Sequence, residues 1–223
     1  MYCISISGRD TREVTALMEK ASVEADILEL RLDMIGKTDI RVLLEASRVP
    51  VIATYRTTAE GGKGQAGWKT VSRLLGEAIK EGADYVDVEW AMPEPIREKL
   101  FESRGRSRII ASLHLDHTPE KKVLSRLLEH MAGSGPDVVK IVTTAGSVRD
   151  NLRVLELIPE AEALGVSIIA FAMGPLGRVS RLLCVPMGGL MTFACLDESS
   201  SMAPGQMTLR QMRRITEVVF GGN

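Results

Sequence analysis

The sequence predicts a single α/β domain over residues 1–223, folded as a (β/α)8 barrel. Three observations support this prediction. Eight short runs rich in β-branched residues recur along the chain, segments with helical spacing separate them, and no linker or change of composition divides the chain. Strands that are joined by helices run parallel, and eight such units close most economically into a barrel of the TIM type.

The predicted strands are short and apolar, and several of them alternate with a period of two. They cover residues 3–7, 27–32, 51–55, 85–89, 109–113, 138–142, 166–171 and 190–194. An open doubly wound sheet is the competing architecture. Eight units would make such a sheet large, and no G-x-G-x-x-G pattern follows the first strand, so the barrel is favoured.

Two connecting segments show the helical pattern clearly. In the first, the apolar positions share one face and the helix is expected to end near Gly82; these positions are Val71, Leu74, Leu75, Ala78 and Ile79. In the second, Thr118 is expected to cap the helix, with Pro119 and Glu120 in its first turn and Gly133 at its end. The apolar face of this second helix comprises Val123, Leu124, Leu127, Leu128 and Met131.

Composition excludes several classes of protein. The 28 Lys and Arg residues nearly balance the 29 Asp and Glu residues, which leaves no excess of positive charge for a nucleic acid. Cys3, Cys184 and Cys195 are odd in number and form no C-x-x-C pair, which argues against disulfides and structural zinc and favours a cytoplasmic location. No apolar run approaches the ~18 residues of a membrane span, and the start of the chain lacks the pattern of a signal peptide.

Polar residues interrupt two strands near the end where a barrel carries its active site. Glu29, Arg31 and Asp33 share one face of the second strand, where they form either a structural ion-pair ladder or part of a site. Asp87 and Glu89 alternate in the same way in the fourth strand. Because no cation adjoins these two in the sequence, a structural role is favoured for them.

Lys140 is the only lysine within a β-like apolar run, Val138 to Val142. A buried ammonium is costly unless it is paired or neutralised, and burial near arginines favours the neutral, nucleophilic amine. The alternative is a lysine whose head reaches solvent at the end of the strand. His114 and His117 follow the fifth strand, and either could act as a general base. With Asp116 they could also ligate a metal, but no other cluster completes such a site, so no metal is expected.

Arginines gather after the predicted strands, at Arg31, Arg56, Arg178 and Arg181. A guanidinium presents a planar fork that suits a carboxylate or a phosphate, so these residues predict a small anionic substrate. The Gly-rich turns near Gly61, Gly174 and Gly205 lack the phosphate-loop pattern. No nucleotide or other cofactor is therefore expected.

Together these residues resemble the type I 3-dehydroquinate dehydratase family, the Schiff-base enzymes of the shikimate pathway. The resemblance covers nearly the whole chain in order. Its matching segments are Ser5 within Ile-Ser-Ile-Ser-Gly, Glu29-Leu30-Arg31-Leu32-Asp33, Arg56 with Glu60-Gly61-Gly62, Ser112-Leu113-His114 with Thr118-Pro119-Glu120, Lys140, Ser180-Arg181, and Ala203-Pro204-Gly205-Gln206. The chain departs from the family's pattern where Met202 replaces a serine next to Ser201, and where Leu115 precedes Asp116.

The resemblance implies a cofactor-free hydro-lyase that converts 3-dehydroquinate to 3-dehydroshikimate by syn elimination, in the biosynthesis of chorismate and the aromatic amino acids. It implies that Lys140 forms the imine, that His114 moves the protons, and that Glu60 orients His114. It also implies that Arg181 binds the substrate carboxylate and that the enzyme is a homodimer. The remaining substrate-binding residues that it implies are Ser5, Glu29, Arg31, Arg56 and Gln206. Because water must be excluded from an imine, we also expect the loop around Gly205 to close over the site.

Three other functions compete with this one. A class I aldolase also uses a Schiff-base lysine on the sixth strand of a barrel. A metal-dependent hydrolase would use His114, Asp116 and His117. A non-catalytic binding barrel would keep the arginines and perform no chemistry. None of the three explains Lys140, His114 and Glu60 together.

Overall fold

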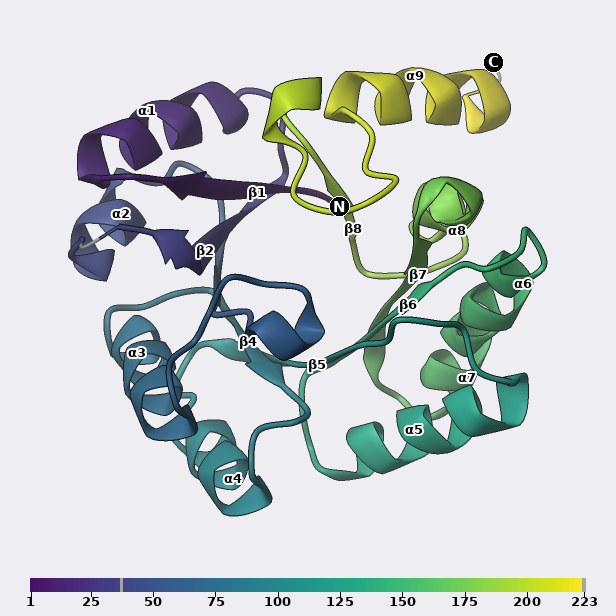
Figure 1. The fold of residues 1–223 in the computed structure, drawn as a ribbon, viewed down its shortest axis with the longest axis horizontal. Helices are drawn as coiled ribbons and strands as arrows, with labels where there is room; N and C mark the ends of the chain where they lie inside the picture. Colours follow the sequence, from purple (N-terminus) through teal and green to yellow (C-terminus); the bar gives the residue numbers. More distant parts are fainter. Residues whose placement is uncertain (37, 222–223) are drawn as a thin grey trace.

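The strands pair in parallel in the order β7-β6-β5-β4-β3-β2-β1-β8, as seen in a computed structural model that describes residues 1–36 and 38–221 (Figure 1). In these ranges the strands are β1 Tyr2–Gly8, β2 Ile27–Ile35, β3 Val51–Thr54, β4 Tyr85–Glu89, β5 Arg108–His114, β6 Val138–Thr144, β7 Ser167–Met173 and β8 Thr192–Ala194. β7 and β8 are the strands at the two ends of this order. The amide of Leu190, just before β8, donates to the carbonyl of Ile168 in β7 at 2.7 Å, so the barrel is nearly closed.

Helices surround the barrel and connect its strands (Figure 1). The α-helices are α1 Thr11–Ala21, α2 Ile40–Ala46, α3 Trp68–Lys80, α4 Glu94–Glu102, α5 Lys121–Gly133, α6 Asp150–Leu155, α7 Leu157–Ala163, α8 Arg178–Leu183 and α9 Leu209–Phe220. The described residues also form three short 3-10 helices, η1 Thr58–Glu60, η2 Pro175–Gly177 and η3 Glu198–Ser200. In the described ranges no helix has the length and apolar character needed to cross a bilayer.

The predicted barrel is confirmed, and its strands lie within a few residues of the predicted runs. The first predicted helix is α3, and Gly82 follows it with a φ of 91°. The predicted cap of α5 is wrong: the helix begins after Glu120, without a side-chain cap. The Thr118 hydroxyl instead donates to the Thr144 carbonyl at 2.9 Å, so it ties the end of β5 to the end of β6.

An apolar layer fills the interior of the barrel towards the N-terminal ends of the strands. It belongs to a buried cluster that draws on all eight strands and their flanking residues: Cys3, Ile27, Ile52, Tyr85, Ile110, Val138, Val142, Ile169, Phe171, Met191 and Phe193. Val142 and Phe171 of this cluster lie nearer the C-terminal ends of β6 and β7, above the layer. Met1 and Leu190 pack against this cluster, and the terminal amine donates to the Leu190 carbonyl at 3.1 Å. Side chains thus close that end of the barrel. A second, larger core lies outside the barrel, under α3, α5 and α7, with Leu75, Leu128 and Leu157 among its members.

Candidate active site

A polar layer lies directly above this apolar layer. Each step of two residues along a strand keeps the same face, so the inner face continues towards the C-terminal end of the barrel. One such step from the apolar layer leads to Ser5, Glu29, Thr54, Asp87, Ser112 and Lys140, all of them buried. Active sites of TIM barrels occupy this end, so the strand pattern itself places the polar groups where chemistry is expected.

A cavity of about 410 Å³ opens above the polar layer, and every site residue expected from the sequence lines it. These residues are Ser5, Glu29, Arg31, Arg56, Glu60, His114, Lys140, Arg181 and Gln206. Apolar side chains complete the wall, among them Val142, Phe171, Met173 and Phe193. The cavity has the size and the mixture of polar and apolar groups that are typical of a small-molecule site.

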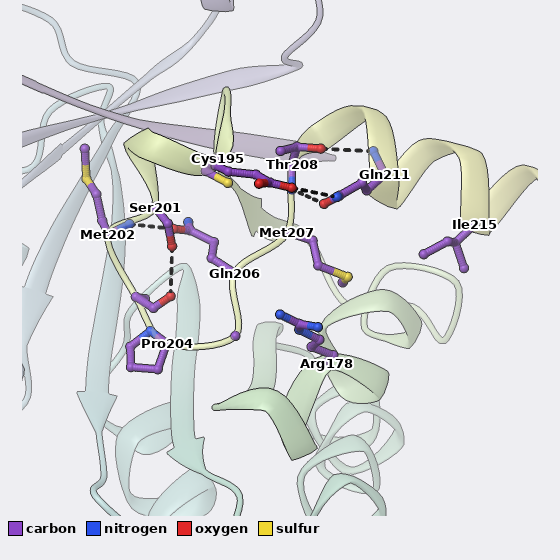
Figure 2. A pocket seen from close by; sticks show the side chains of 13 residues that line it. Arg178, Cys195, Ser201, Met202, Pro204, Gln206, Met207, Thr208, Gln211 and Ile215 are labelled. Atoms are coloured by element: carbon purple, nitrogen blue, oxygen red, sulfur yellow. Dashed lines mark hydrogen bonds between the residues drawn. The ribbon is translucent and has the colours of Figure 1, made fainter.

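The loop after β8 forms one side of this cavity. The Met202 amide donates to Gln206 Oε1 at 2.8 Å (Figure 2). Gln206 Nε2 donates to the Ala194 carbonyl at 3.2 Å, so the Gln206 amide organises the loop. Met202 lines this cavity and also a neighbouring cavity of about 920 Å³, whereas Ser201 lines the neighbouring cavity and not this one. Gly205 has a φ of 75°, and a Cβ there would approach the Gly174 carbonyl oxygen to 2.2 Å, so this turn requires glycine.

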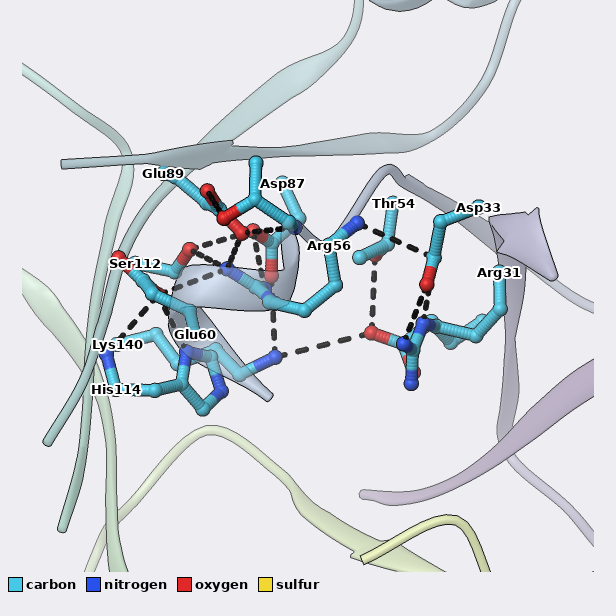
Figure 3. A network of polar contacts seen from close by, with 12 residues as sticks. Arg31, Asp33, Thr54, Arg56, Glu60, Asp87, Glu89, Ser112, His114 and Lys140 are labelled. Atoms are coloured by element: carbon cyan, nitrogen blue, oxygen red, sulfur yellow. Dashed lines mark hydrogen bonds and ion pairs between the residues drawn. The ribbon is translucent and has the colours of Figure 1, made fainter. Parts of the chain in front are cut away.

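Lys140 is buried at the base of the cavity. Its Nζ donates to Asp87 Oδ2 at 3.0 Å (Figure 3). Nζ also lies 3.7 Å from Glu29 Oε1 and 4.2 Å from the centre of the Phe193 ring. The sequence led us to expect that nearby arginines favour the neutral amine. The groups in contact with Nζ are instead two carboxylates and an aromatic face, and all of them stabilise an ammonium.

Arg56 lies among three buried carboxylates (Figure 3). Its NH2 donates to Asp87 Oδ1 at 2.7 Å, and its NH1 lies 3.1 Å from Glu89 Oε1 and 3.2 Å from Glu60 Oε2. Burial opposes the charge of Arg56, but the three carboxylates together raise its pKa. Burial would likewise raise the pKa of Asp87, but Arg56 and Lys140 hold it well below its ordinary value.

The sequence shows no cation next to Asp87 and Glu89, but the fold places Arg56 beside both. The register between β3 and β4 pairs Thr54 with Asp87, and this pairing places Arg56, two residues beyond Thr54, beside both carboxylates. Asp87 belongs to the site because it contacts Lys140. No local pattern could identify that contact, since the two residues are 53 positions apart.

His114 and Glu60 form a hydrogen-bonded pair. Nδ1 of His114 lies 2.9 Å from Glu60 Oε2, and the His114 backbone amide donates to the same oxygen at 3.1 Å. Because this oxygen also accepts from Arg56, it acts as an acceptor, and the proton of the imidazole lies on Nδ1. Burial, together with Arg56 and Lys140, holds the pKa of His114 well below its ordinary value. His114 is therefore a neutral imidazole with Nε2 available as a base.

Glu60 itself has an unusual environment. Burial raises its pKa to about 7; the Glu89 and Asp87 carboxylates add to the increase, and Arg56 opposes it. Its second oxygen, Oε1, is buried and has no hydrogen-bond partner among residues 1–36 and 38–221. The proton of the neutral acid is therefore accommodated on Oε1 while Oε2 keeps its three donors.

Arg181 supplies a buried positive charge without a carboxylate partner in the described part of the chain. Its NH1 donates to the Phe193 carbonyl at 2.9 Å, and its guanidinium lies 4.3 Å from the centre of the Phe171 ring. Nε and NH2 are buried and unpaired within those same residues. Burial lowers the pKa of Arg181 to about 10, which still leaves it charged at neutral pH. Such a group is suited to bind an anion that enters the cavity.

Asn151 holds the short helix that carries Arg181, and the sequence offered no signal for it. Its Oδ1 accepts from the Ser180 amide at 2.9 Å, and its Nδ2 donates to the carbonyls of Leu176 at 2.7 Å and Val148 at 2.8 Å. A helix of 6 residues such as α8 has little stability of its own. Asn151 therefore fixes its position from α6.

The polar face of β2 contains a structural ion pair as well as residues that line the cavity. Arg31 donates to both oxygens of Asp33, at 2.9 and 2.8 Å, so the structural ion pair considered from the sequence is present. Asp33 also accepts the backbone amides of Arg56 at 3.2 Å and Lys63 at 2.9 Å, and so anchors the segment that carries Glu60. Next to it, Glu29 Oε2 accepts from the Ser5 hydroxyl at 2.5 Å.

His117 and Asp116 do not join His114 at one point. His117 Nδ1 pairs with Asp116 Oδ1 at 2.7 Å, and both side chains are largely exposed, 71% and 97%. Among the residues described, no group of three or more His, Cys, Asp and Glu side chains is arranged to hold a metal ion. The metal-dependent alternative therefore gains no support from the donor geometry.

Comparisons with known proteins agree with the geometry. The family model for type I 3-dehydroquinase matches residues 2–223. The chain belongs to this family. This 3-dehydroquinase is 35% identical over 232 aligned positions to the 3-dehydroquinate dehydratase of Syntrophobacter fumaroxidans, with 100% of this chain and 97% of that protein covered. It is 38% identical over 208 positions to that of Dehalococcoides mccartyi, covering 92% and 91% of the two chains.

Solved structures show the same barrel. The 3-dehydroquinate dehydratase from Geobacillus kaustophilus superposes with a TM-score of 0.89 at 28% identity, covering 98% of this 3-dehydroquinase and 90% of that chain. A 3-hexulose-6-phosphate synthase from Salmonella typhimurium shares the fold alone, at a TM-score of 0.60 and 16% identity. The predicted family and the predicted enzyme class, a hydro-lyase, are confirmed by the family match.

Proposed function

We propose that this 3-dehydroquinase converts 3-dehydroquinate to 3-dehydroshikimate and water through a Schiff base on Lys140. One observation carries the proposal. A buried lysine, a neutral imidazole and an unpaired buried guanidinium line a single cavity of about 410 Å³. These groups supply, respectively, a nucleophile, a base and a binding site for a carboxylate.

The proposed reaction begins when the neutral amine of Lys140 attacks the C3 carbonyl of the substrate. The carbinolamine takes back the proton that Lys140 gave up on becoming neutral, loses water and leaves a protonated imine. This imine withdraws electrons from C2, so the imidazole of His114 removes the C2 proton and an enamine forms. The enamine expels the C1 hydroxyl, which takes the proton from His114 and leaves as water. Hydrolysis of the remaining imine consumes one water, releases 3-dehydroshikimate and restores Lys140.

The site's own contacts support the role of the imidazole. With Nδ1–H donated to Glu60 Oε2, Nε2 is the remaining nitrogen that can take a proton. The low pKa of His114 keeps the imidazole neutral, and therefore ready to accept the C2 proton, throughout the neutral range. Glu60 is thus a positioning residue that selects the tautomer and the ring orientation.

Substrate binding is proposed to rest on the two unpaired guanidinium nitrogens of Arg181, which would pair with the substrate carboxylate. The hydroxyls and the carbonyl of the substrate would be bound by Ser5, Glu29, Arg31, Arg56 and Gln206, all of which line the cavity. Each of these residues is held by contacts of its own: Ser5 with Glu29, Arg31 with Asp33, Arg56 with Asp87, and Gln206 with the backbone of Met202 and Ala194. They are therefore preorganised for the substrate.

Borohydride reduction in the presence of 3-dehydroquinate tests the proposal. Reduction of the imine would leave a stable secondary amine, and intact-mass and peptide analysis would place the substrate-derived mass on Lys140. Lys140→Met is the matched control, because it keeps the side chain's length and removes the amine. Failure to form an adduct in folded protein, or an adduct that persists in Lys140→Met, would refute the Schiff base.

We further propose that the enzyme is a cytoplasmic homodimer. Exposed apolar side chains lie together on α6, α8 and the residues before them, namely Val148, Leu152, Leu176 and Val179. The two helices pack beside each other (Figure 1), so these exposed side chains belong to neighbouring segments of the surface. Light scattering after size-exclusion chromatography would give the mass of a dimer, and Leu152→Glu should reduce it to that of a monomer.

A further inference from the structure

Asp87 lies beneath the catalytic cavity and outside its lining, yet it makes the shortest contact to Lys140. The carboxylate is buried, and its Oδ2 accepts from Lys140 Nζ at 3.0 Å. Its other oxygen accepts from Arg56 NH2 at 2.7 Å and from the Ser112 hydroxyl at 2.5 Å. Three donors from different elements therefore fix the orientation of this carboxylate, and through it the position of the lysine.

The other groups that face Lys140 do not replace this contact. Glu29 lies farther away, with Oε1 at 3.7 Å from Nζ, and is itself occupied by hydroxyl donors from Ser5 and Thr54. His114 is neutral, and Arg56 is a cation that pairs with Glu60, Asp87 and Glu89, so neither group can form an ion pair with an ammonium on Lys140. The remaining contact is the face of Phe193, which attracts a cation and not a neutral amine.

We propose that Asp87 is a positioning residue that holds Lys140 as an ammonium in the empty site and so keeps the lysine from reacting with other carbonyl compounds. This proposal rests on the proposed function in one respect, namely that Lys140 is the nucleophile. The ammonium has no lone pair and cannot attack a carbonyl. The ion pair with Asp87 opposes loss of its proton until substrate occupies the cavity.

Trace acetylation of the substrate-free enzyme with acetic anhydride tests this proposal. The reagent acylates only the neutral amine, and peptide mass analysis separates Lys140 from the exposed Lys20, which serves as internal reference. In Asp87→Asn, half-labelling of Lys140 should move to lower pH by about one to three pH units, because an opposite charge at this distance is lost. The kcat for 3-dehydroquinate should fall more than KM rises, since Asp87 does not line the cavity.

Glu89→Gln is the matched control. Glu89 is a buried carboxylate that pairs with the same Arg56, at 3.1 Å, but its two oxygens bond to Arg56 and Thr57 and not to Lys140. Loss of the Glu89 carboxylate should shift the pH of half-labelling of Lys140 far less than loss of the Asp87 carboxylate does. Equal shifts in the two variants, or no shift in Asp87→Asn, would overturn the proposal.

Two further measurements keep the test decisive. If Asp87→Asn does not fold, Asp87→Ser removes the charge with a smaller side chain and should show the same shift. In the wild type, half-labelling of Lys140 below about pH 7 would refute the proposal without any variant. Because the labelling uses no substrate, a failed borohydride adduct with a clear labelling shift would reject the Schiff base and leave the role of Asp87 standing.

Discussion

Replacing Glu60 with glutamine tests the electrostatics of the site through the stability of the protein. Burial raises the pKa of Glu60 from its ordinary value of 4.5 to about 7 in the folded chain. A group whose pKa rises on folding contributes stability that is fully present below its unfolded pKa and is lost as the pH passes its folded pKa. The free energy of unfolding of the wild type should therefore fall by about 2–3 kcal/mol, relative to that of Glu60→Gln, as the pH rises from about 5 to about 8. The 6% exposure of this side chain leaves little solvent to screen the effect.

Urea unfolding of both proteins at several pH values in this range would measure the difference. Glutamine stays neutral, so the free energy of unfolding of the variant should lack the decline that Glu60 causes. Glu77→Gln is a suitable control, because Glu77 is a half-exposed carboxylate on α3 that pairs only with Arg73 among the described residues. A difference between wild type and Glu60→Gln that stays constant across this pH range would refute the assignment of the raised pKa.

The remaining predictions concern activity and its relation to stability. The kcat of the wild type should rise as the pH passes about 7, since ionised Glu60 accepts a stronger, charge-assisted hydrogen bond from Nδ1 and so makes Nε2 of His114 a stronger base, and the pH profile of Glu60→Gln should lack this rise. His114→Ala should lower kcat by roughly 10²- to 10⁴-fold while the borohydride adduct on Lys140 still forms. Arg181→Met should raise the KM by roughly 30-fold or more, because a buried charge pair with the substrate is lost. The same variant should be about 1–2 kcal/mol more stable in urea, because it no longer buries an unpaired charge. Asn151→Leu should raise KM through the displacement of Arg181, and its effect should largely disappear in the Arg181→Met background.

Specific outcomes would contradict each of these predictions. A pH profile shared by wild type and Glu60→Gln would show that Glu60 does not control the base. Rapid turnover by His114→Ala would exclude the imidazole as the base. For Asn151, Ser107→Ala is the matched control, since it removes a buried hydrogen bond of 2.6 Å to the Ala83 carbonyl at the opposite end of the barrel. If Asn151→Leu raises KM equally in the wild-type and Arg181→Met backgrounds, Asn151 has a purely structural role.

Much of the site could be predicted from the sequence because its residues interrupt a regular pattern. A lysine within an apolar run and acids that alternate with leucines are unusual, and the period of two assigns them to one face of a strand. The eight strand-helix units then place these faces inside one barrel. Lys140, Glu29 and Arg31 could therefore be expected at a common site before any contact was known.

The errors arose where contacts depend on the register between strands. Thr118 has the sequence of a helix cap, but its hydroxyl donates to the end of β6, a partner that is distant in the chain. Asp87 has no cation beside it in the sequence and two in the fold, Arg56 and Lys140. Asn151 is an ordinary residue of a short helix until its contacts with Ser180 and Leu176 are known.

The sequence by itself determined the architecture, the family and the residue types of the site, because periodicity and motif order are local properties of the chain. Only the tertiary structure decided the charge states within that site. The ion pair of Lys140 with Asp87, the neutral imidazole of His114 and the raised pKa of Glu60 all depend on burial and on neighbours from other strands. The same holds for the charge of Arg181, which has no carboxylate partner among the described residues. Electrostatic energies change with distance and with exposure to water, and both are set when the barrel closes.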